Sequence, residues 1–174
     1  MSTPTNSTSP LRSITDEIDH ALKARLYFLA ILVTLSLPDV CAALESDDGK
    51  TSHAKYKAWC DRWIVPAYPM LTSLDIYSLR CGVVHQGRFG HDKMQYSRVL
   101  FTIPDGRGNV FHRNVVNDAL NLDCVSFCYD MIDAVNRWYD DKQSESNVIA
   151  NLPRLVRLHP NGVAPYMVGM PVIT

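Results

Sequence analysis

The stretch TSLDIYSLRCGVVHQG, residues 72–87, carries the clearest fold signal in this sequence because it marks both ends of one helix. Thr72 and Asp75 have the spacing of a capping box, in which each side chain accepts a hydrogen bond from the other residue's backbone N–H. Gly87 suits the left-handed conformation that commonly follows the last residue of a helix. The stretch therefore predicts one well-defined helix that ends at Gly87.

Apolar residues three or four positions apart predict further helices on both sides of this stretch. We expect a helix over about 14–36 that Pro38 helps to end, a short one over 39–45, one over 53–64 and a long one over 115–141. The fold class expected is therefore all-α: an antiparallel bundle of four to five helices with one or two inserted β-hairpins.

Two segments have the residue pattern of β-hairpins. Residues 95–113 hold two runs rich in β-branched and aromatic residues on either side of Asp-Gly-Arg-Gly, which predicts a hairpin inserted between helices. The tail over about 150–174 is irregular, and its Asn161-Gly162 pair predicts a second small hairpin. Residues 1–10 are dominated by Ser, Thr, Pro and Asn, so we expect a disordered tail before a single domain over 11–174.

Length and composition are those of one soluble globular domain. The chain has 174 residues, 47% of them apolar and 20% charged, which is enough to build one hydrophobic core. The net charge of −1 excludes a strong overall attraction for polyanions, but residues 80–113 hold six Lys and Arg against two acids. Such a segment is either a solvated loop or a surface for an anionic ligand.

The cysteines and the most apolar run both favour a reducing, aqueous compartment. The five cysteines are odd in number and scattered through apolar helical sequence, as in proteins whose thiols stay free. Cys124 and Cys128 lack a second pair of metal ligands, so we expect them in the core and expect no metal or other cofactor. The uncharged run over 26–37 has 12 residues, fewer than the about 20 that span a bilayer, so we expect a buried helix of a cytoplasmic protein without membrane contact.

Arg80 and His85 are the candidate catalytic residues. An arginine and a histidine separated by four residues occur three times, but only this pair lies on a predicted helix. Histidine exchanges a proton near neutral pH, and arginine offers a permanent fork of donors to phosphate oxygens. The pair suits metal-independent RNA cleavage, in which the ribose 2′-OH attacks the adjacent phosphate. The alternative is structural: His85 bonds the last helix carbonyls and the Arg80 stem covers the bundle.

The segment YSLRCGVVHQG, residues 77–87, resembles the HEPN superfamily and its Arg-x4–6-His signature. The resemblance covers the helical parts, about 14–86 and 115–140, and leaves out both predicted hairpins. It implies a helical core that forms a homodimer in which two copies of the motif helix face each other. It also implies that Arg80 and His85 are the catalytic pair of an endoribonuclease, in a toxin–antitoxin or defence system with a partner antitoxin.

The same resemblance leaves other functions open. Active members usually carry Asn, Asp or His straight after the arginine, where this chain has Cys81. A non-catalytic HEPN-like module that binds a nucleotide or a protein partner is therefore the alternative, and a plain helical scaffold is the third. If RNA is the substrate, we expect contacts to its phosphates from Arg88, Arg98, Arg107 and Arg113. We expect surface positions for His91, His112 and His159.

Overall fold

The computed structural model describes residues 9–89 and 94–174, so the expectations for residues 1–8 and for His91 lie outside the described residues. Of the predicted N-terminal tail, residues 9 and 10 are described, and Ser9 is buried. Its Oγ accepts a hydrogen bond from the backbone N–H of Leu11 at 3.2 Å.

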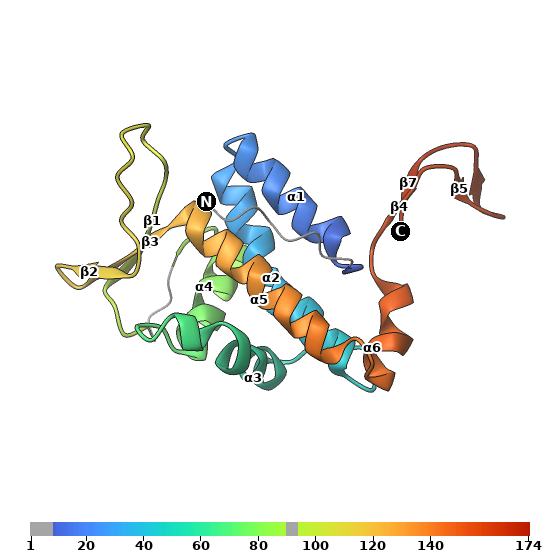
Figure 1. The fold of residues 1–174 in the computed structure, drawn as a ribbon, viewed down its shortest axis with the longest axis horizontal. Helices are drawn as coiled ribbons and strands as arrows, with labels where there is room; N and C mark the ends of the chain where they lie inside the picture. The colour runs from blue at the N-terminus through green and yellow to red at the C-terminus, as the bar shows by residue number, and fades with distance from the viewer. Residues whose placement is uncertain (1–8, 90–93) are drawn as a thin grey trace.

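The described residues form a helical body with a small sheet at one end and a hairpin arm at the other (Figure 1). The helices are α1 (Arg12–Lys23), α2 (Tyr27–Glu45), α3 (His53–Trp63), α4 (Ser73–Gln86), α5 (Cys124–Lys142) and α6 (Ser146–Asn151). Two short 3-10 turns accompany them, η1 (Val65–Ala67) and η2 (Leu152–Arg154). The strands are β1 (Arg98–Thr102), β2 (Asn114–Val116), β3 (Ala119–Asp123), β4 (Leu158–His159), β5 (Gly162–Val163), β6 (Met167–Val168) and β7 (Val172–Ile173).

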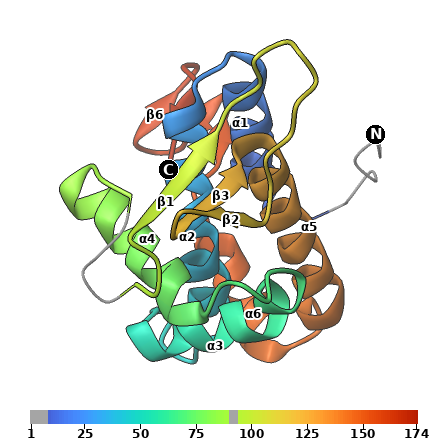
Figure 2. The same cartoon turned by 90° about the vertical axis from the view of Figure 1, so that its left-hand side faces the viewer.

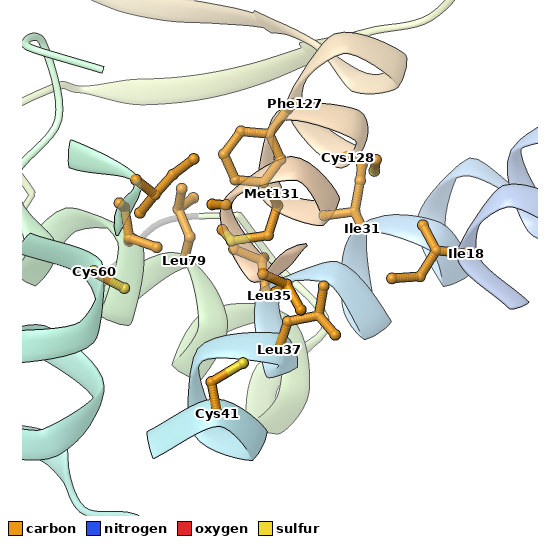
Figure 3. Packing of buried hydrophobic residues seen from close by; sticks show 14 of the residues in the cluster. Ile18, Ile31, Leu35, Leu37, Cys41, Cys60, Leu79, Phe127, Cys128 and Met131 are labelled. Carbon is orange, nitrogen blue, oxygen red and sulfur yellow. The ribbon is translucent and has the colours of Figure 1, made fainter. Parts of the chain in front are cut away.

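Helix α2 is the centre of the body, since it packs against α1, α3, α4, α5 and α6. Figure 3 shows Leu35 and Leu37 of α2 in the same buried cluster as Phe127 and Met131 of α5, and all four are fully buried. Four of the five cysteines are also buried in this core, as expected for free thiols in a helical interior. Burial of this apolar surface is the main term that stabilises the fold.

The expectation of an all-α fold is wrong. Helices take up about 54% of the described residues and strands about 13%, so the fold mixes a helical body with small sheets. The largest sheet has the strand order β1-β3-β2, and Figure 2 shows it across one end of the body, near α4 and α5. The other two sheets pair β4 with β7 and β5 with β6 in the C-terminal arm.

The hairpin predicted over 95–113 is also wrong. Strand β1 pairs in parallel with β3, Arg98 opposite Ala119, and the only hairpin of this sheet joins β2 to β3. Its two turn residues, Asn117 and Asp118, have φ values of 49° and 61°, the left-handed pair that a tight two-residue turn needs. Asp-Gly-Arg-Gly instead lies in the long connection from β1 to β2. Parallel strands are joined by a long connection, so no local sequence pattern predicts that β1 pairs with β3.

Three helix boundaries differ from expectation. The predicted helix over 14–36 breaks at Arg25, which has a φ of 61°, and α2 then runs through Pro38 to Glu45. Proline inside a helix costs about 3 kcal/mol, and burial of side chains on both sides of Pro38 outweighs that cost. The helix predicted over 115–141 begins only at Cys124, because the preceding residues form β2 and β3.

Because α2 is longer than predicted, it is the one helix of the described residues that is long and apolar enough to cross a membrane. Half of its most apolar window is buried inside the protein, as in the core helix of a soluble protein. The length argument made from the sequence therefore does not apply, because α2 has 19 residues.

The C-terminal arm contains a hairpin, as predicted, but its turn is not at Asn161-Gly162. Asn161 lies between β4 and β5, and Gly162 is the first residue of β5. The chain reverses between Val163 and Met167, where the N–H of Tyr166 donates to the carbonyl of Val163 at 3.0 Å. Gly162 has a φ of 81°, and a Cβ there would lie 2.2 Å from the carbonyl oxygen of Met167. The glycine is therefore needed for close backbone approach rather than for the turn.

Candidate functional site

The guanidinium of Arg80 lies between a carboxylate on α2 and the imidazole of His85. Its Nη1 is 3.2 Å from Nε2 of His85, and its Nε donates a hydrogen bond to Oδ2 of Asp39 at 2.8 Å. Asp39 is bonded on its other oxygen as well, since Thr51 Oγ1 donates to Oδ1 at 3.2 Å. The structure therefore brings the two predicted catalytic residues together and adds Asp39 to them.

The ends of α4 fix this geometry, and both were predicted from the sequence. Thr72 Oγ1 accepts from the N–H of Asp75 at 3.1 Å, while Asp75 Oδ2 accepts from the N–H of Thr72 at 2.9 Å. Gly87 is left-handed, with a φ of 62°, and ends the helix two residues after His85. Arg80 and His85 point about 140° apart on an ideal helix, so their contact depends on the length of the arginine side chain.

The contact between Arg80 and His85 is a hydrogen bond for one tautomer of the imidazole. An arginine N–H can only donate, so Nε2 of His85 must carry its lone pair and the ring proton must be on Nδ1. A protonated imidazole has no lone pair to accept this bond. As a hydrogen bond, the contact therefore requires neutral histidine, the form that can act as a general base.

Asp39 determines the electrostatics of Arg80. Burial lowers the pKa of the Arg80 guanidinium, but the negative charge of Asp39 and its hydrogen bond outweigh burial and raise the pKa above its ordinary value. The side chain of Arg80 is 23% exposed and that of Asp39 is 16% exposed, while His85 is exposed. The arginine is thus held charged at the edge of the core, with the imidazole open to solvent.

Tyr77 of α4 belongs to a group of aromatic side chains that includes residues of α3. The ring of Tyr77 packs against that of His53 with centroids 4.4 Å apart, and against Tyr56 at 5.3 Å. Cys81 lies one turn after Tyr77 on α4, and its interaction with the Tyr77 side chain raises the pKa of Tyr77. Cys81, the residue that departs from the HEPN pattern, is therefore part of the site.

The four arginines predicted to bind phosphate lie in different elements of the fold. Arg88 lies just past α4, where its Nε donates to Oε1 of Gln86 at 2.6 Å, and its side chain is exposed. Arg98 begins β1 and Arg107 lies in the connection from β1 to β2, and both are exposed. Arg113 is engaged within the protein. Three of the four are therefore free to reach a ligand from the surface.

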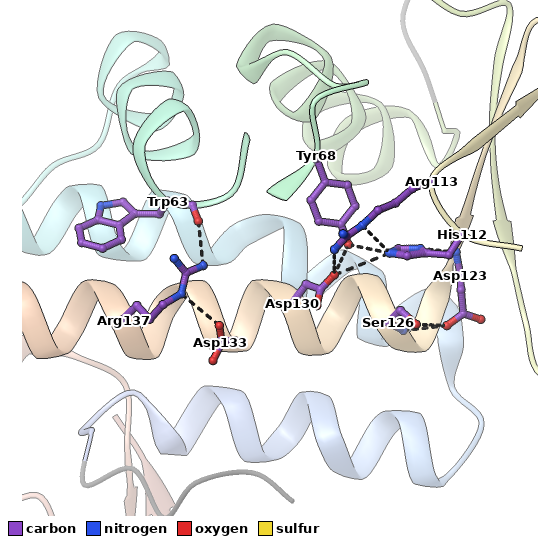
Figure 4. Close-up of polar contacts among 9 residues, drawn as sticks. All are labelled: Trp63, Tyr68, His112, Arg113, Asp123, Ser126, Asp130, Asp133 and Arg137. Atoms are coloured by element: carbon purple, nitrogen blue, oxygen red, sulfur yellow. Dashed lines mark hydrogen bonds and ion pairs between the residues drawn. The ribbon is translucent and has the colours of Figure 1, made fainter. Parts of the chain in front are cut away.

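Arg113 belongs to a second polar cluster, which joins the sheet to α5 (Figure 4). Its Nη2 donates to Oδ2 of Asp130 at 2.6 Å, and its guanidinium carbon lies 4.4 Å from the ring centroid of Tyr68. The hydroxyl of Tyr68 donates to the same carboxylate oxygen at 2.7 Å. Arg113 has a φ of 57°, a left-handed conformation that costs an L-residue about 1–2 kcal/mol and that these contacts offset.

His112 is part of this cluster, so its predicted surface position is wrong. Its side chain is 15% exposed, and its Nδ1 accepts a hydrogen bond from the N–H of Asp123 at 3.0 Å. Its Nε2 lies 3.2 Å from the hydroxyl oxygen of Tyr68 and accepts a hydrogen bond from Nε of Arg113 at 3.1 Å. His159 lies in β4 and is partly buried.

Asp39 is the functional residue that the sequence analysis missed. It lies 41 positions from Arg80, and no spacing rule connects them. The available signal was a charge inside an otherwise apolar helix, because Asp39 and Glu45 are the only charged residues of α2. A charge in such a position is usually paired.

Within the described residues, no group of three or more His, Cys, Asp or Glu side chains is placed to hold a metal ion. No protein-family model, curated protein or solved structure is similar enough to this chain to identify a relative. Function must therefore be argued from the site itself.

Proposed function

We propose that the protein is a metal-independent endoribonuclease of the HEPN type, with Arg80 and His85 as its catalytic pair. The observation that carries this proposal is the 3.2 Å contact between Nη1 of Arg80 and Nε2 of His85. Two residues that diverge on an ideal helix are held together here at the exposed end of α4, and Asp39 keeps the arginine in place.

In the proposed reaction, Nε2 of His85 removes the proton from a ribose 2′-OH, and the oxygen attacks the adjacent phosphorus. The bond from phosphorus to the 5′-oxygen breaks, which leaves a 2′,3′-cyclic phosphate, and the 5′-oxygen takes up a proton. Arg80 donates to the non-bridging phosphoryl oxygens, whose charge grows in the transition state. Entry of the phosphate would replace the Arg80–His85 contact and free the imidazole lone pair.

We propose a homodimer in which a second copy supplies the acid that protonates the leaving 5′-oxygen. Val84, next to His85, is 41% exposed, and Phe28 of α2 is 51% exposed. The ring of Phe28 lies 6.4 Å from that of Phe89, which follows α4 in sequence. Exposed apolar residues beside a polar site support an interface between subunits at this position.

Arg88, Arg98 and Arg107 are proposed to guide the RNA backbone, because each is exposed and basic. Arg113 is a weaker candidate, since Asp130 already neutralises it. We place the protein in the cytoplasm, in a toxin–antitoxin or defence system with an antitoxin as its partner. These last assignments rest on the sequence resemblance.

A non-catalytic module that binds a nucleotide or a protein partner is the second candidate. It is favoured by Cys81, which follows Arg80 at the position where active HEPN members usually have Asn, Asp or His. In that case the Arg80–Asp39 pair would serve to hold α4 on α2.

The test is cleavage of structured and unstructured RNA in the presence of EDTA. We expect products with 2′,3′-cyclic phosphate ends and no cleavage by Arg80→Ala or His85→Ala. Arg12→Ala and His20→Ala, which change the same residue types on the exposed face of α1, should retain full activity. Activity that requires magnesium or survives both site substitutions would exclude this mechanism. Loss of nucleotide or partner binding without any cleavage would support the second candidate.

A further inference from the structure

Three aromatic rings lie in series from the core to the surface where α3 packs against α4. The innermost is Tyr56 of α3, which is fully buried and donates its hydroxyl to the carbonyl of Leu35 at 2.9 Å. Tyr77 of α4 is partly buried and packs edge-on against Tyr56, with ring centroids 5.3 Å apart. The outermost ring is that of His53, an exposed residue whose ring centroid lies 4.4 Å from that of Tyr77. His53 is therefore an exposed ring with a fixed aromatic support on its protein side.

This series of rings lies beside the proposed nuclease site. Tyr77 is three positions before Arg80 on α4, about 4.5 Å along the helix axis, so the two side chains are neighbours on the helix surface. His53 comes two residues after Thr51, whose hydroxyl donates to Asp39. Asp39 in turn accepts from Arg80. The rings are therefore close enough to contact the nucleotide next to the one that reacts.

A ring in this position is a stacking surface for a nucleobase. Bases stack on aromatic side chains, histidine included, and proteins that bind single strands use this contact because every base has a flat face. Tyr77 lies on one side of the His53 ring, and the exposure of His53 leaves the other side to a ligand. A base reaches such a surface only when it is unpaired and turned out of its stack. Contacts from arginine to phosphate have no such requirement.

We propose that His53, supported by Tyr77, binds a nucleobase next to the reacting phosphate and selects RNA that is unpaired at that base. This inference rests on the proposed function, since it takes RNA as the ligand of Arg80 and His85. It adds a specificity-determining residue of α3 to a site otherwise built on α2 and α4. His53 has no part in the proton transfers.

The first experiment measures binding without cleavage. A fluorescein-labelled single-stranded RNA with 2′-O-methyl groups has no 2′-OH to attack phosphorus, so its fluorescence anisotropy gives a Kd for the full chain. We expect His53→Ala to raise this Kd about fivefold to a hundredfold, the usual effect of losing one stacked ring. His53→Phe keeps a ring but not the imidazole nitrogens, and its Kd should stay within about threefold of the wild type.

The matched control is His20→Ala, which removes an exposed histidine from α1 and should leave the Kd unchanged. An unchanged Kd in His53→Ala would overturn the proposal. A loss in His53→Phe equal to that in His53→Ala would also overturn it, because the ring would then contribute nothing.

The second experiment removes the base instead of the ring. An abasic nucleotide replaces each position of the same RNA in turn, and binding is measured for the wild type and for His53→Ala. At one position the wild type should lose as much affinity as His53→Ala loses on the intact RNA, and the two changes together should cost no more than either alone. Losses that add at every position would show that no base contacts His53.

A complementary strand provides a third comparison, because pairing hides the bases and leaves the phosphates. In the duplex, the wild type and His53→Ala should bind equally well. A difference that persists in the duplex would contradict the selection of an unpaired base.

These measurements distinguish failure of the base site from failure of the nuclease. If cleavage depends on Arg80 and His85 while His53→Ala binds and cleaves like the wild type, the base site is wrong and the nuclease stands. If no RNA is cleaved but His53 and one base remain coupled in binding, the nuclease is wrong. The base site then stands as part of the non-catalytic module.

Discussion

Asp39 Oδ2 accepts a hydrogen bond from Nε of Arg80 at 2.8 Å. A residue of α2 therefore fixes the position of the candidate catalytic arginine of α4. Because Nε is taken, the terminal nitrogens are directed toward His85 and solvent. The carboxylate therefore sets the direction of the guanidinium as well as its charge.

The first prediction concerns Asp39 as a positioning residue of the proposed nuclease. Asp39→Asn keeps the size of the side chain but removes the charge that holds Nε of Arg80. We expect kcat to fall about tenfold to a hundredfold with a much smaller change in KM, because misplaced groups reduce transition-state stabilisation. The measurement is steady-state cleavage of a short RNA. Asp39→Glu should recover part of the rate.

The matched control is Thr51→Val, which removes the other hydrogen bond to Asp39 and leaves its charge. We expect a loss of less than about threefold in kcat, because Arg80 keeps its partner. If Asp39→Asn and Thr51→Val lost the same fraction of kcat and the same free energy of unfolding, Asp39 would act only through stability.

The second prediction concerns thiol reactivity. Cys81 is the one partly exposed cysteine, and the other four are buried. Burial also raises the pKa of the Cys41 and Cys60 thiols well above the ordinary value, which disfavours the reactive thiolate. We expect the dithiobis reagent DTNB to label one thiol of the native chain rapidly and all five after unfolding. Cys81→Ser should abolish the rapid phase.

Labelling of Cys81 should also stop RNA cleavage, since the added aromatic disulfide would lie beside Arg80. Cys81→Ser treated with the reagent should keep its activity. A rapid phase that persists in Cys81→Ser would show that another cysteine is more accessible than the structure indicates.

The third prediction concerns pH and the cluster around Asp130. Burial raises the pKa of Asp130, but hydrogen bonds from His112, Tyr68 and Arg113 and the charge of Arg113 outweigh it and lower the pKa to about 2. A carboxyl with a lower pKa in the folded state stabilises the fold above its unfolded pKa of 3.8, and this contribution is lost as the pH falls toward 2. The side chain is 37% exposed, so screening reduces the contribution to about 1 kcal/mol.

Urea unfolding of the wild type and of Asp130→Asn at several pH values tests this. We expect the wild type to be more stable by about 1 kcal/mol or more near pH 6, and the difference to shrink between pH 4 and pH 2. Asp133→Asn, one turn further along α5 and 68% exposed, serves as the control and should change little. A stability difference that does not depend on pH would assign the effect to lost packing.

The fourth prediction concerns the turn between β2 and β3. Asn117 has a φ of 49°, so Asn117→Ala should destabilise the protein by about 1 kcal/mol because alanine resists the left-handed conformation. Asn117→Gly removes the same side chain but accepts this conformation, and should be close to the wild type. The measurement is the urea midpoint of unfolding. Equal stabilities of the alanine and glycine variants would contradict the two-residue turn.

The sequence by itself determined the features whose causes lie within a few residues. The capping box at Thr72 and the left-handed Gly87 predicted α4 and both of its ends, and apolar spacing predicted α3 and most of α5. A hydrogen bond to a backbone group three residues away needs nothing from the rest of the chain. For the same reason, the positions of Arg80 and His85 on one helix could be predicted.

Only the tertiary structure decided the features that depend on distant residues. Three features are of this kind: the parallel pairing of β1 with β3, the continuation of α2 through Pro38, and the hydrogen bond between Asp39 and Arg80. No local sequence pattern encodes them. Burial also placed His112 in the cluster around Asp130 rather than on the surface. Packing free energy accumulates over many side chains at once, so it can override the propensity of a single residue and choose partners far away in the chain.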